Sequence, residues 1–160
     1  MPDLKVKSSL EFVRCGDAHI PEVIRLLHKL YKELDEGDDE RVSFLLTEDA
    51  VKRMISRGVT TIIAACDEGR LVGIITLTES QAFYAGGPYG CIDELYVLPE
   101  YRSRRLGSSL LDEAKWLART SRWQRIVVNT PKDRIRWGAT LRFYERNGFG
   151  VTGNKLKFQL

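Results

Sequence analysis

Three arginines and several small residues stand close together in the segment Tyr101-Arg-Ser-Arg-Arg-Leu-Gly-Ser108. Apolar residues with helical spacing follow it. A helix that begins here would present free N–H groups and a partial positive charge, and guanidinium groups suit phosphate oxygens. The segment therefore predicts a site for a phosphate-bearing ligand. An ordinary exposed, basic helix start explains the same residues equally well, and the spacing alone leaves both interpretations open.

The elements that must position this segment show two kinds of pattern. Segments rich in β-branched residues predict strands at 10–14, 60–66, 71–78, 91–98 and 125–128. Apolar residues at helical spacing predict helices at 20–34, 44–58, 104–119 and 136–147. Residues 81–90 are expected to form an irregular loop, and residues 149–160 one or two last strands. The order predicts an α/β fold of the mixed α+β type, with one mixed, mostly antiparallel sheet and helices on both faces.

Length and composition exclude several classes of protein. The 160 residues fit one domain, and no stretch is long and apolar enough to cross a membrane. The first residues lack the apolar core of a secretory signal, so we expect a cytoplasmic protein with no membrane partner. Cys15, Cys66 and Cys91 lack paired spacing, and the chain has only two histidines, so we expect neither a disulfide framework nor a metal.

Charge is distributed unevenly along the chain. The net charge of +3 is too small to indicate a nucleic-acid partner. Six acidic residues lie at positions 33–40. They form either a solvated loop or an entrance that attracts a cationic substrate.

The segment Leu95-Tyr-Val-Leu-Pro-Glu-Tyr-Arg-Ser-Arg-Arg-Leu-Gly-Ser-Ser-Leu-Leu111 closely resembles the acetyl-CoA signature of the GCN5-related N-acetyltransferases (GNAT family). Phe143-Tyr-Glu-Arg-Asn-Gly-Phe149 resembles the last conserved block of that family. The resemblance implies a single GNAT domain over residues 1–160, with splayed strands that form a slot for CoA. It also implies an enzyme that moves the acetyl group of acetyl-CoA to a primary amine of a small molecule or peptide, by direct attack in a ternary complex. A homodimer is compatible with it.

Two positions depart from the family pattern. Arg105 stands where the first glycine of the signature is usual, and we expect binding to be retained because arginine fits a helical first turn. Trp137 stands where an asparagine is often found, so Asn129 or Thr130 is expected to supply its contribution.

The resemblance assigns candidate roles to individual residues. The residues expected to bind the cofactor are Leu95, Tyr96, Val97, Arg102, Ser103, Arg104, Arg105, Leu106, Gly107, Ser108, Ser109 and Asn129. Tyr144 is expected to protonate the departing thiolate, although a core aromatic with a satisfied hydroxyl is the alternative. Glu94 is the candidate that accepts the proton of the amine, but it could instead pair with an arginine, and water could relay the proton. Tyr31, Tyr84 and Trp137 are expected to contact the acceptor.

Two further interpretations stay open. Because of Arg105, the chain could be an acyl-CoA sensor or interaction module that keeps the fold without turnover. The arginine-rich turn could also be a contact for nucleic acid, which would show as salt-sensitive binding.

Overall fold

The computed structural model of the chain describes residues 10–34, 46–130, 134–153, 155–158 and 160, the side chains of Ser103 and Arg134 excepted. Its helices and strands are β1 (Leu10–Arg14), α1 (Ile20–Leu34), α3 (Glu48–Ser56), β2 (Thr60–Asp67), β3 (Arg70–Ala82), β4 (Gly87–Val97), α4 (Leu106–Thr120), β5 (Ile126–Val128) and α5 (Arg134–Arg146). Short 3₁₀ helices cover Asp17–His19, Phe83–Ala85 and Pro99–Arg104.

The five strands form one sheet in the order β1-β2-β3-β4-β5. The first four strands pair antiparallel in succession, whereas β5 runs parallel to β4. The prediction of a mixed, mostly antiparallel sheet is therefore confirmed. A parallel neighbour requires a crossover connection, and α4 provides it between β4 and β5.

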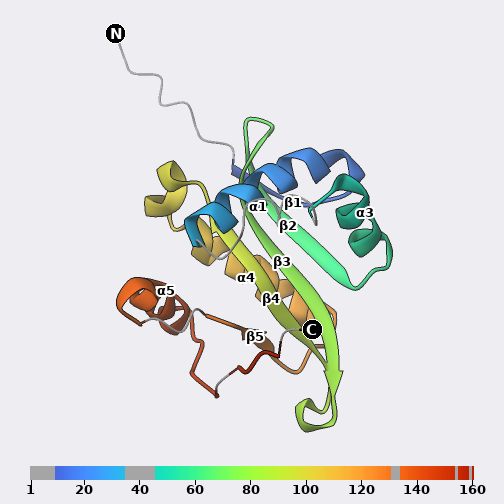
Figure 1. Cartoon of the computed structure of the whole chain (residues 1–160), viewed down its shortest axis with the longest axis vertical. Helices are drawn as coiled ribbons and strands as arrows, with labels where there is room; N and C mark the ends of the chain where they lie inside the picture. The colour runs from blue at the N-terminus through green and yellow to red at the C-terminus, as the bar shows by residue number, and fades with distance from the viewer. Residues whose placement is uncertain (1–9, 35–45, 131–133, 154, 159) are drawn as a thin grey trace.

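Helices cover both faces of the sheet. Figure 1 shows α1 crossing in front of the strands and α4 lying behind them. Both helices contact β3, and each contributes leucines that are fully buried, such as Leu26 of α1 and Leu110 of α4. A strand covered on both faces loses the alternation of buried and exposed residues. Accordingly, residues 71–77 of β3 are all buried, and this run forms the centre of the core.

Strand β4 contains an irregularity at the point where β5 ends. Thr76 pairs with Glu94 and Leu77 pairs with Ile92, so Asp93 is an extra residue without a partner of its own in β3. The parallel pairing with β5 also ends at Ile92. A bulge bends its strand and interrupts the ladder. From Asp93 to Val97, β4 therefore has one edge that pairs with none of the described strands.

The prediction of an irregular loop at 81–90 is wrong. Strand β3 continues to Ala82, β4 begins at Gly87, and only the short turn Phe83–Ala85 separates them. Gly86 and Gly87 allow the turn because both have positive φ angles, which glycine adopts without steric cost. Gly90, expected to break the regular structure, lies against Trp123 so closely that a Cβ would approach its ring to 2.2 Å.

Two other expectations need correction or fall outside the described residues. Among residues 149–153, 155–158 and 160, none belongs to a strand, so the prediction of terminal strands is wrong there. Alternation of apolar residues favours a strand only where a partner pairs with its N–H and C=O groups, and these residues pair with none of the described strands. The second helix begins at Glu48, capped by Thr47, and Phe44 and Leu45 lie outside the described residues.

Candidate active site

A cavity of about 950 Å³ lies beside the unpaired edge of β4. Four elements line it: the end of α1, the end of β4, the turn into α4, and α5. Its lining residues are Leu30, Glu33, Leu34, Leu95, Tyr96, Val97, Arg102, Arg105, Gly107, Ser108, Trp137, Ala139, Thr140, Phe143, Tyr144, Arg146 and Asn147. A cavity of this volume accommodates a ligand the size of a cofactor. It brings together seven of the predicted cofactor residues.

The wall formed by β4 follows from the bulge and the short β5. Leu95, Tyr96 and Val97 line the cavity, and no described strand pairs with them on the side away from β3. Backbone N–H and C=O groups on a free strand edge can pair with an extended ligand as they would with another strand. The sequence prediction placed these three residues at the cofactor, and the cavity contains them.

The turn into α4 has a backbone that the sequence did not predict. Arg105 has a φ of 59° and a ψ of 15°, so it is left-handed and not part of a right-handed first turn. The expectation of a helical Arg105 is therefore wrong. The usual glycine fits this position because it adopts a positive φ without strain, whereas arginine adopts it at a cost of about 1 kcal/mol. The Arg105 side chain nevertheless lines the cavity.

Gly107 and Ser108 lie in the first turn of α4 and also line the cavity. The absence of a side chain at Gly107 has a packing role as well, because a Cβ there would lie 3.2 Å from Cζ of Phe143 in α5. Gly107 thus allows α5 to approach α4 at the cavity. The N–H groups at the start of this 15-residue helix remain available to an anion.

Arg102 is held by partners on two other elements. Its Nε donates to the carbonyl oxygen of Val97 at 2.9 Å, and its Nη2 donates to both carboxylate oxygens of Glu33 at 2.9 and 2.8 Å. The guanidinium also lies 5.4 Å from the centre of the Tyr96 ring. The hydroxyl of Tyr96 donates to Glu33 at 2.8 Å, and burial together with this hydrogen bond raises the pKa of Tyr96 to about 12.

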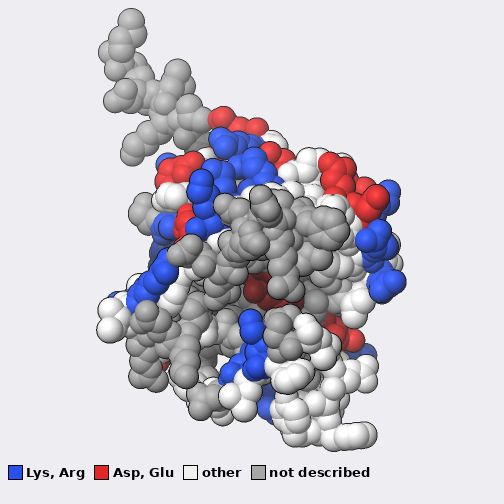
Figure 2. All heavy atoms as spheres, viewed as in Figure 1, with Lys and Arg blue, Asp and Glu red and all other residues white. Residues whose placement is uncertain are grey.

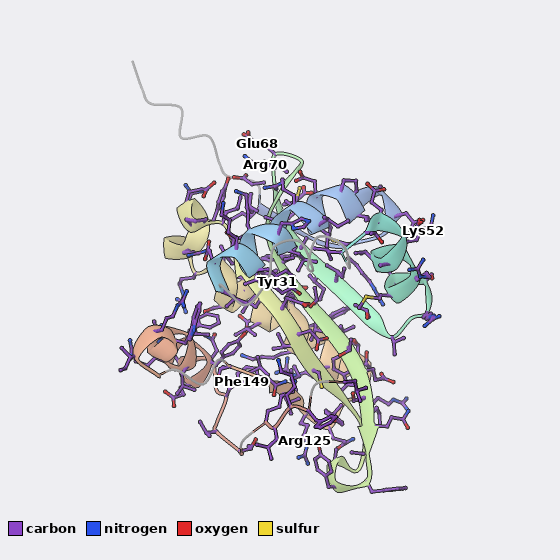
Figure 3. All side chains as sticks on the ribbon, in the orientation of Figure 1. Tyr31, Lys52, Glu68, Arg70, Arg125 and Phe149 are labelled. Atoms are coloured by element: carbon purple, nitrogen blue, oxygen red, sulfur yellow. The ribbon has the colours of Figure 1, made fainter. Side chains whose placement is uncertain are left out.

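Tyr144 lies in α5 with 7% of its surface exposed, and it lines the cavity. Its ring packs edge-on against the rings of Phe143 and Phe149. Burial raises the pKa of Tyr144 to about 12, because the tyrosinate would lose its hydration. Figure 3 shows Phe149, which covers this ring, between α5 and β5.

Glu94 accepts hydrogen bonds on both carboxylate oxygens. Tyr31 of α1 donates to Oε1 at 2.5 Å, and the hydroxyl of Thr76 in β3 donates to Oε2. The backbone N–H of Glu94 in turn donates to the Thr76 oxygen at 3.0 Å. Figure 3 places Tyr31 where α1 crosses the sheet, and Figure 2 shows acidic atoms recessed in the middle of this face. Glu94 thus has hydroxyl partners and no arginine partner among the described residues.

Several predicted residues lie outside the cavity. Leu106 is buried in the core, Arg104 lies over the ring of Tyr101, and the Ser109 hydroxyl donates to the Arg105 carbonyl oxygen. Asn129 is exposed after the end of β5. Ser103 belongs to the 3₁₀ helix before Arg105, and its side chain is not described.

The three residues expected at the acceptor do not form one wall. Trp137 lines the cavity, and Tyr31 contacts Glu94. Tyr84 lies in the turn at the opposite end of β4, where its backbone carbonyl accepts from Arg125 at 3.3 Å. Figure 3 shows Arg125 near the tip of this hairpin, far from Tyr31. The structure therefore separates Tyr84 from the other two.

Sequence reasoning missed several residues that line the cavity, among them Glu33, which accepts hydrogen bonds from the predicted residues Tyr96 and Arg102. It belongs to the acidic run at 33–40 and lies in the last turn of α1, within the helix predicted at 20–34. Arg146 and Asn147 were also missed, even though they belong to the block 143–149. Their position in that block was a usable signal.

Two features are absent from the described residues. These residues contain no cluster of three or more His, Cys, Asp or Glu side chains placed to hold a metal ion. None of the described helices has the length and apolar character needed to span a membrane.

The comparisons with known proteins agree with this geometry. The family model of the acetyltransferase (GNAT) domain matches residues 58–151, which is more than half of the chain. The chain therefore belongs to the GNAT acetyltransferase family, whose members generally transfer an acetyl group from acetyl-CoA. No curated protein matches the chain in sequence.

Solved structures share the fold. An acetyltransferase from Trypanosoma brucei is 22% identical, with a TM-score of 0.74 over 95% of this chain and 100% of that one. A ribosomal-protein-alanine N-acetyltransferase from Brucella melitensis is 18% identical, with a TM-score of 0.73 over 95% and 99%. An aminoglycoside acetyltransferase from an uncultured soil metagenomic sample, in complex with sisomicin, is 15% identical, with a TM-score of 0.73 over 94% and 95%.

Proposed function

We propose that residues 1–160 form one domain that transfers the acetyl group of acetyl-CoA to a primary amine of a small molecule or peptide, by direct attack in a ternary complex. The observation that carries this proposal is the cavity itself. It joins the free edge of β4, the start of α4 and the buried residue Tyr144 in one space.

The residues of the cavity suit the parts of acetyl-CoA. The N–H groups at Gly107 and Ser108, with the guanidinium groups of Arg102 and Arg105, would hold the pyrophosphate. The edge of Leu95–Val97 would pair with the amides of the pantetheine arm. A backbone N–H on this edge would also polarise the thioester carbonyl as negative charge develops on its oxygen.

Glu94 is the proposed acceptor for the proton of the amine. Most primary amines are protonated at neutral pH, so a proton must leave before nitrogen can attack the thioester carbon. The two hydroxyl donors, Tyr31 and Thr76, stabilise the ionised carboxylate in one orientation. Glu94 does not itself line the cavity, so a water molecule would carry the proton from the amine to the carboxylate.

Tyr144 is the proposed proton donor to the sulfur when the carbon–sulfur bond breaks. A pKa of about 12 keeps its hydroxyl protonated throughout the physiological range. The raised pKa also makes it a weaker acid, but the departing thiolate in the same cavity loses hydration for the same reason, so its affinity for a proton rises too. The transfer therefore occurs between groups whose pKa values are shifted in the same direction.

Direct attack is favoured because no cysteine lines the cavity. Cys15 is buried in the core, where burial raises the pKa of its thiol to about 12, and a thiol in this state is a poor nucleophile. Cys66 and Cys91 are half-buried and absent from the cavity lining.

The acceptor would carry an amine, and two similar structures support this: one is an aminoglycoside acetyltransferase in complex with sisomicin, and another is a ribosomal-protein-alanine N-acetyltransferase. Tyr31, which donates to Glu94, and Trp137, which lines the cavity, would contact this acceptor. The proposed site leaves out Tyr84, because this residue lies at the far end of β4.

Calorimetric titration with acetyl-CoA, combined with an assay for free thiol across a panel of amines, tests the proposal. We expect saturable binding of acetyl-CoA and thiol release that depends on the amine. Binding without thiol release for every small-molecule and peptide amine would contradict the proposed reaction and leave an acyl-CoA-binding protein.

A further inference from the structure

Glu33 and Arg102 form an ion pair in the wall of the cavity. Glu33 lies in the last turn of α1, and Arg102 lies in the 3₁₀ helix before α4. Both residues line the cavity, and their closest nitrogen–oxygen distance is 2.8 Å. Glu33 therefore places a negative charge in the same cavity that Arg102, Gly107 and Ser108 line.

We propose that Glu33 competes with the phosphates of acetyl-CoA for Arg102 and thereby sets the affinity of the protein for its acyl donor. This inference rests on the proposed function, because it assumes that acetyl-CoA occupies this cavity. It assigns to Glu33 an effect that acts through Arg102, so Glu33 is a positioning residue and not a catalytic one.

Arg102 can exchange its ion pair with Glu33 for one with a phosphate at little cost. The side chains of Arg102 and Glu33 are 46% and 43% exposed, and pairs in contact with water contribute little to stability. When Arg102 turns toward a phosphate, Glu33 keeps the hydrogen bond from the Tyr96 hydroxyl and contact with water. Neither partner is then left buried without a hydrogen bond, so the exchange carries no large desolvation cost.

Glu33 has two opposite effects on a bound phosphate. Its negative charge repels the phosphate and neutralises Arg102, but its carboxylate also orients the guanidinium. The orienting effect is partly redundant, because the Nε bond to Val97 and the contact with the Tyr96 ring hold Arg102 without Glu33. The repulsive effect has no substitute. We therefore expect removal of the charge to strengthen binding.

The first test is calorimetric titration of the full chain with acetyl-CoA. Glu33→Gln keeps the shape of the side chain and removes its charge, and we expect acetyl-CoA to bind about threefold to tenfold more tightly than to the wild type. Glu33→Ala is a second variant with the same expected direction. The matched control is Glu48→Gln, at an exposed position in α3 outside the cavity lining, which changes the net charge equally. We expect this control to bind as the wild type does.

The second test combines variants. Arg102→Ala should weaken binding, and in that background Glu33→Gln should improve the affinity by less than about twofold, since the residue that transmits most of the effect is gone.

An unchanged or weaker affinity for acetyl-CoA in both Glu33 variants would overturn the inference, and so would a full gain of affinity in the absence of Arg102. Damage to the fold would weaken binding, which is opposite to the expected direction. The wild type measured alongside keeps the two proposals apart, because failure of the wild type to bind acetyl-CoA would defeat the proposed function itself.

Discussion

Tyr31, in the last turn of α1, donates a hydrogen bond of 2.5 Å to Oε1 of Glu94 in β4, across a separation of 63 positions in the chain. A second hydrogen bond runs in the opposite sense two residues further along both elements, where Tyr96 of β4 donates to Glu33 of α1. Together they join the end of α1 to the part of β4 whose second edge, away from β3, pairs with none of the described strands. This junction borders the cavity and fixes both carboxylates.

The first prediction concerns the group around Glu94. We expect Glu94→Gln to lower kcat about 100-fold, since a positioned proton acceptor contributes roughly this much. Tyr31→Phe and Thr76→Val should each lower kcat about fivefold, the equivalent of one hydrogen bond of about 1 kcal/mol. Steady-state thiol release measures these rates. Tyr89→Phe, in the distant hairpin of β3 and β4, is the matched control and should leave kcat unchanged; an equal effect there would remove the role of Tyr31.

A second prediction separates chemistry from binding at Tyr144. We expect Tyr144→Phe to lower kcat about 100-fold while the Kd for acetyl-CoA changes less than about twofold, because the ring and its packing remain. Thiol release and calorimetry on the same preparation check this. A variant that turns over at the wild-type rate would show that Tyr144 is an aromatic residue of the core and not the proton donor.

Burial of Tyr144 also predicts how stability depends on pH. Its pKa is about 12 in the folded protein and about 10 in the unfolded chain, so the unfolded chain loses this proton first as the pH rises. The contribution is fully present below pH 10 and is lost between about pH 10 and 12, and it amounts to about 2–3 kcal/mol. Tyr96 contributes in the same window. Urea unfolding between pH 9 and 11 should therefore show a smaller loss of stability in Tyr144→Phe than in the wild type, and equal slopes would contradict a buried, protonated Tyr144.

The left-handed backbone at Arg105 predicts a difference between two substitutions. Glycine adopts a φ of 59° freely, whereas alanine does not, so we expect Arg105→Gly to be about 1 kcal/mol more stable than Arg105→Ala. Both variants lack the guanidinium and should bind acetyl-CoA more weakly than the wild type by a similar factor. Urea unfolding and calorimetry measure the two effects separately. Equal stability of the variants would mean that the backbone here is not left-handed.

Packing at Gly107 predicts that a second substitution, at Phe143, compensates for Gly107→Ala. We expect Gly107→Ala to lose about 1–2 kcal/mol of stability and to bind acetyl-CoA more weakly, because the added Cβ would lie 3.2 Å from Phe143 and push α5 away. Phe143→Leu in the same chain should restore part of both losses, since the ring that crowds Cβ is removed. Gly153→Ala, where nothing lies within 4 Å, is the control and should change neither quantity. Absence of rescue would indicate that Gly107 is needed for another reason.

Local patterns in the sequence predicted most of the elements. The β-branched runs at 60–66 and 71–78 correspond to β2 and β3, and helical spacing located α1, α4 and α5 within two residues at each end. These elements form where neighbouring residues share one preference, which is why spacing along the chain identifies them. The same patterns failed at residues 81–90, where pairing of the consecutive strands β3 and β4 and the fit of Gly90 against Trp123 overrode the preference of glycine and proline for loops.

The sequence by itself also determined which residues occupy the start of α4 and the end of α5, and through them the family. Tertiary structure alone decided how these residues meet. The left-handed Arg105, the packing of Gly107 on Phe143, and the pairs Tyr31 with Glu94 and Arg102 with Glu33 join positions that no local pattern connects. Such contacts depend on the register of β4 and on the angle at which α1 crosses the sheet. Both are set by packing of the whole core, and a change of one residue in the register would turn each side chain to the other face.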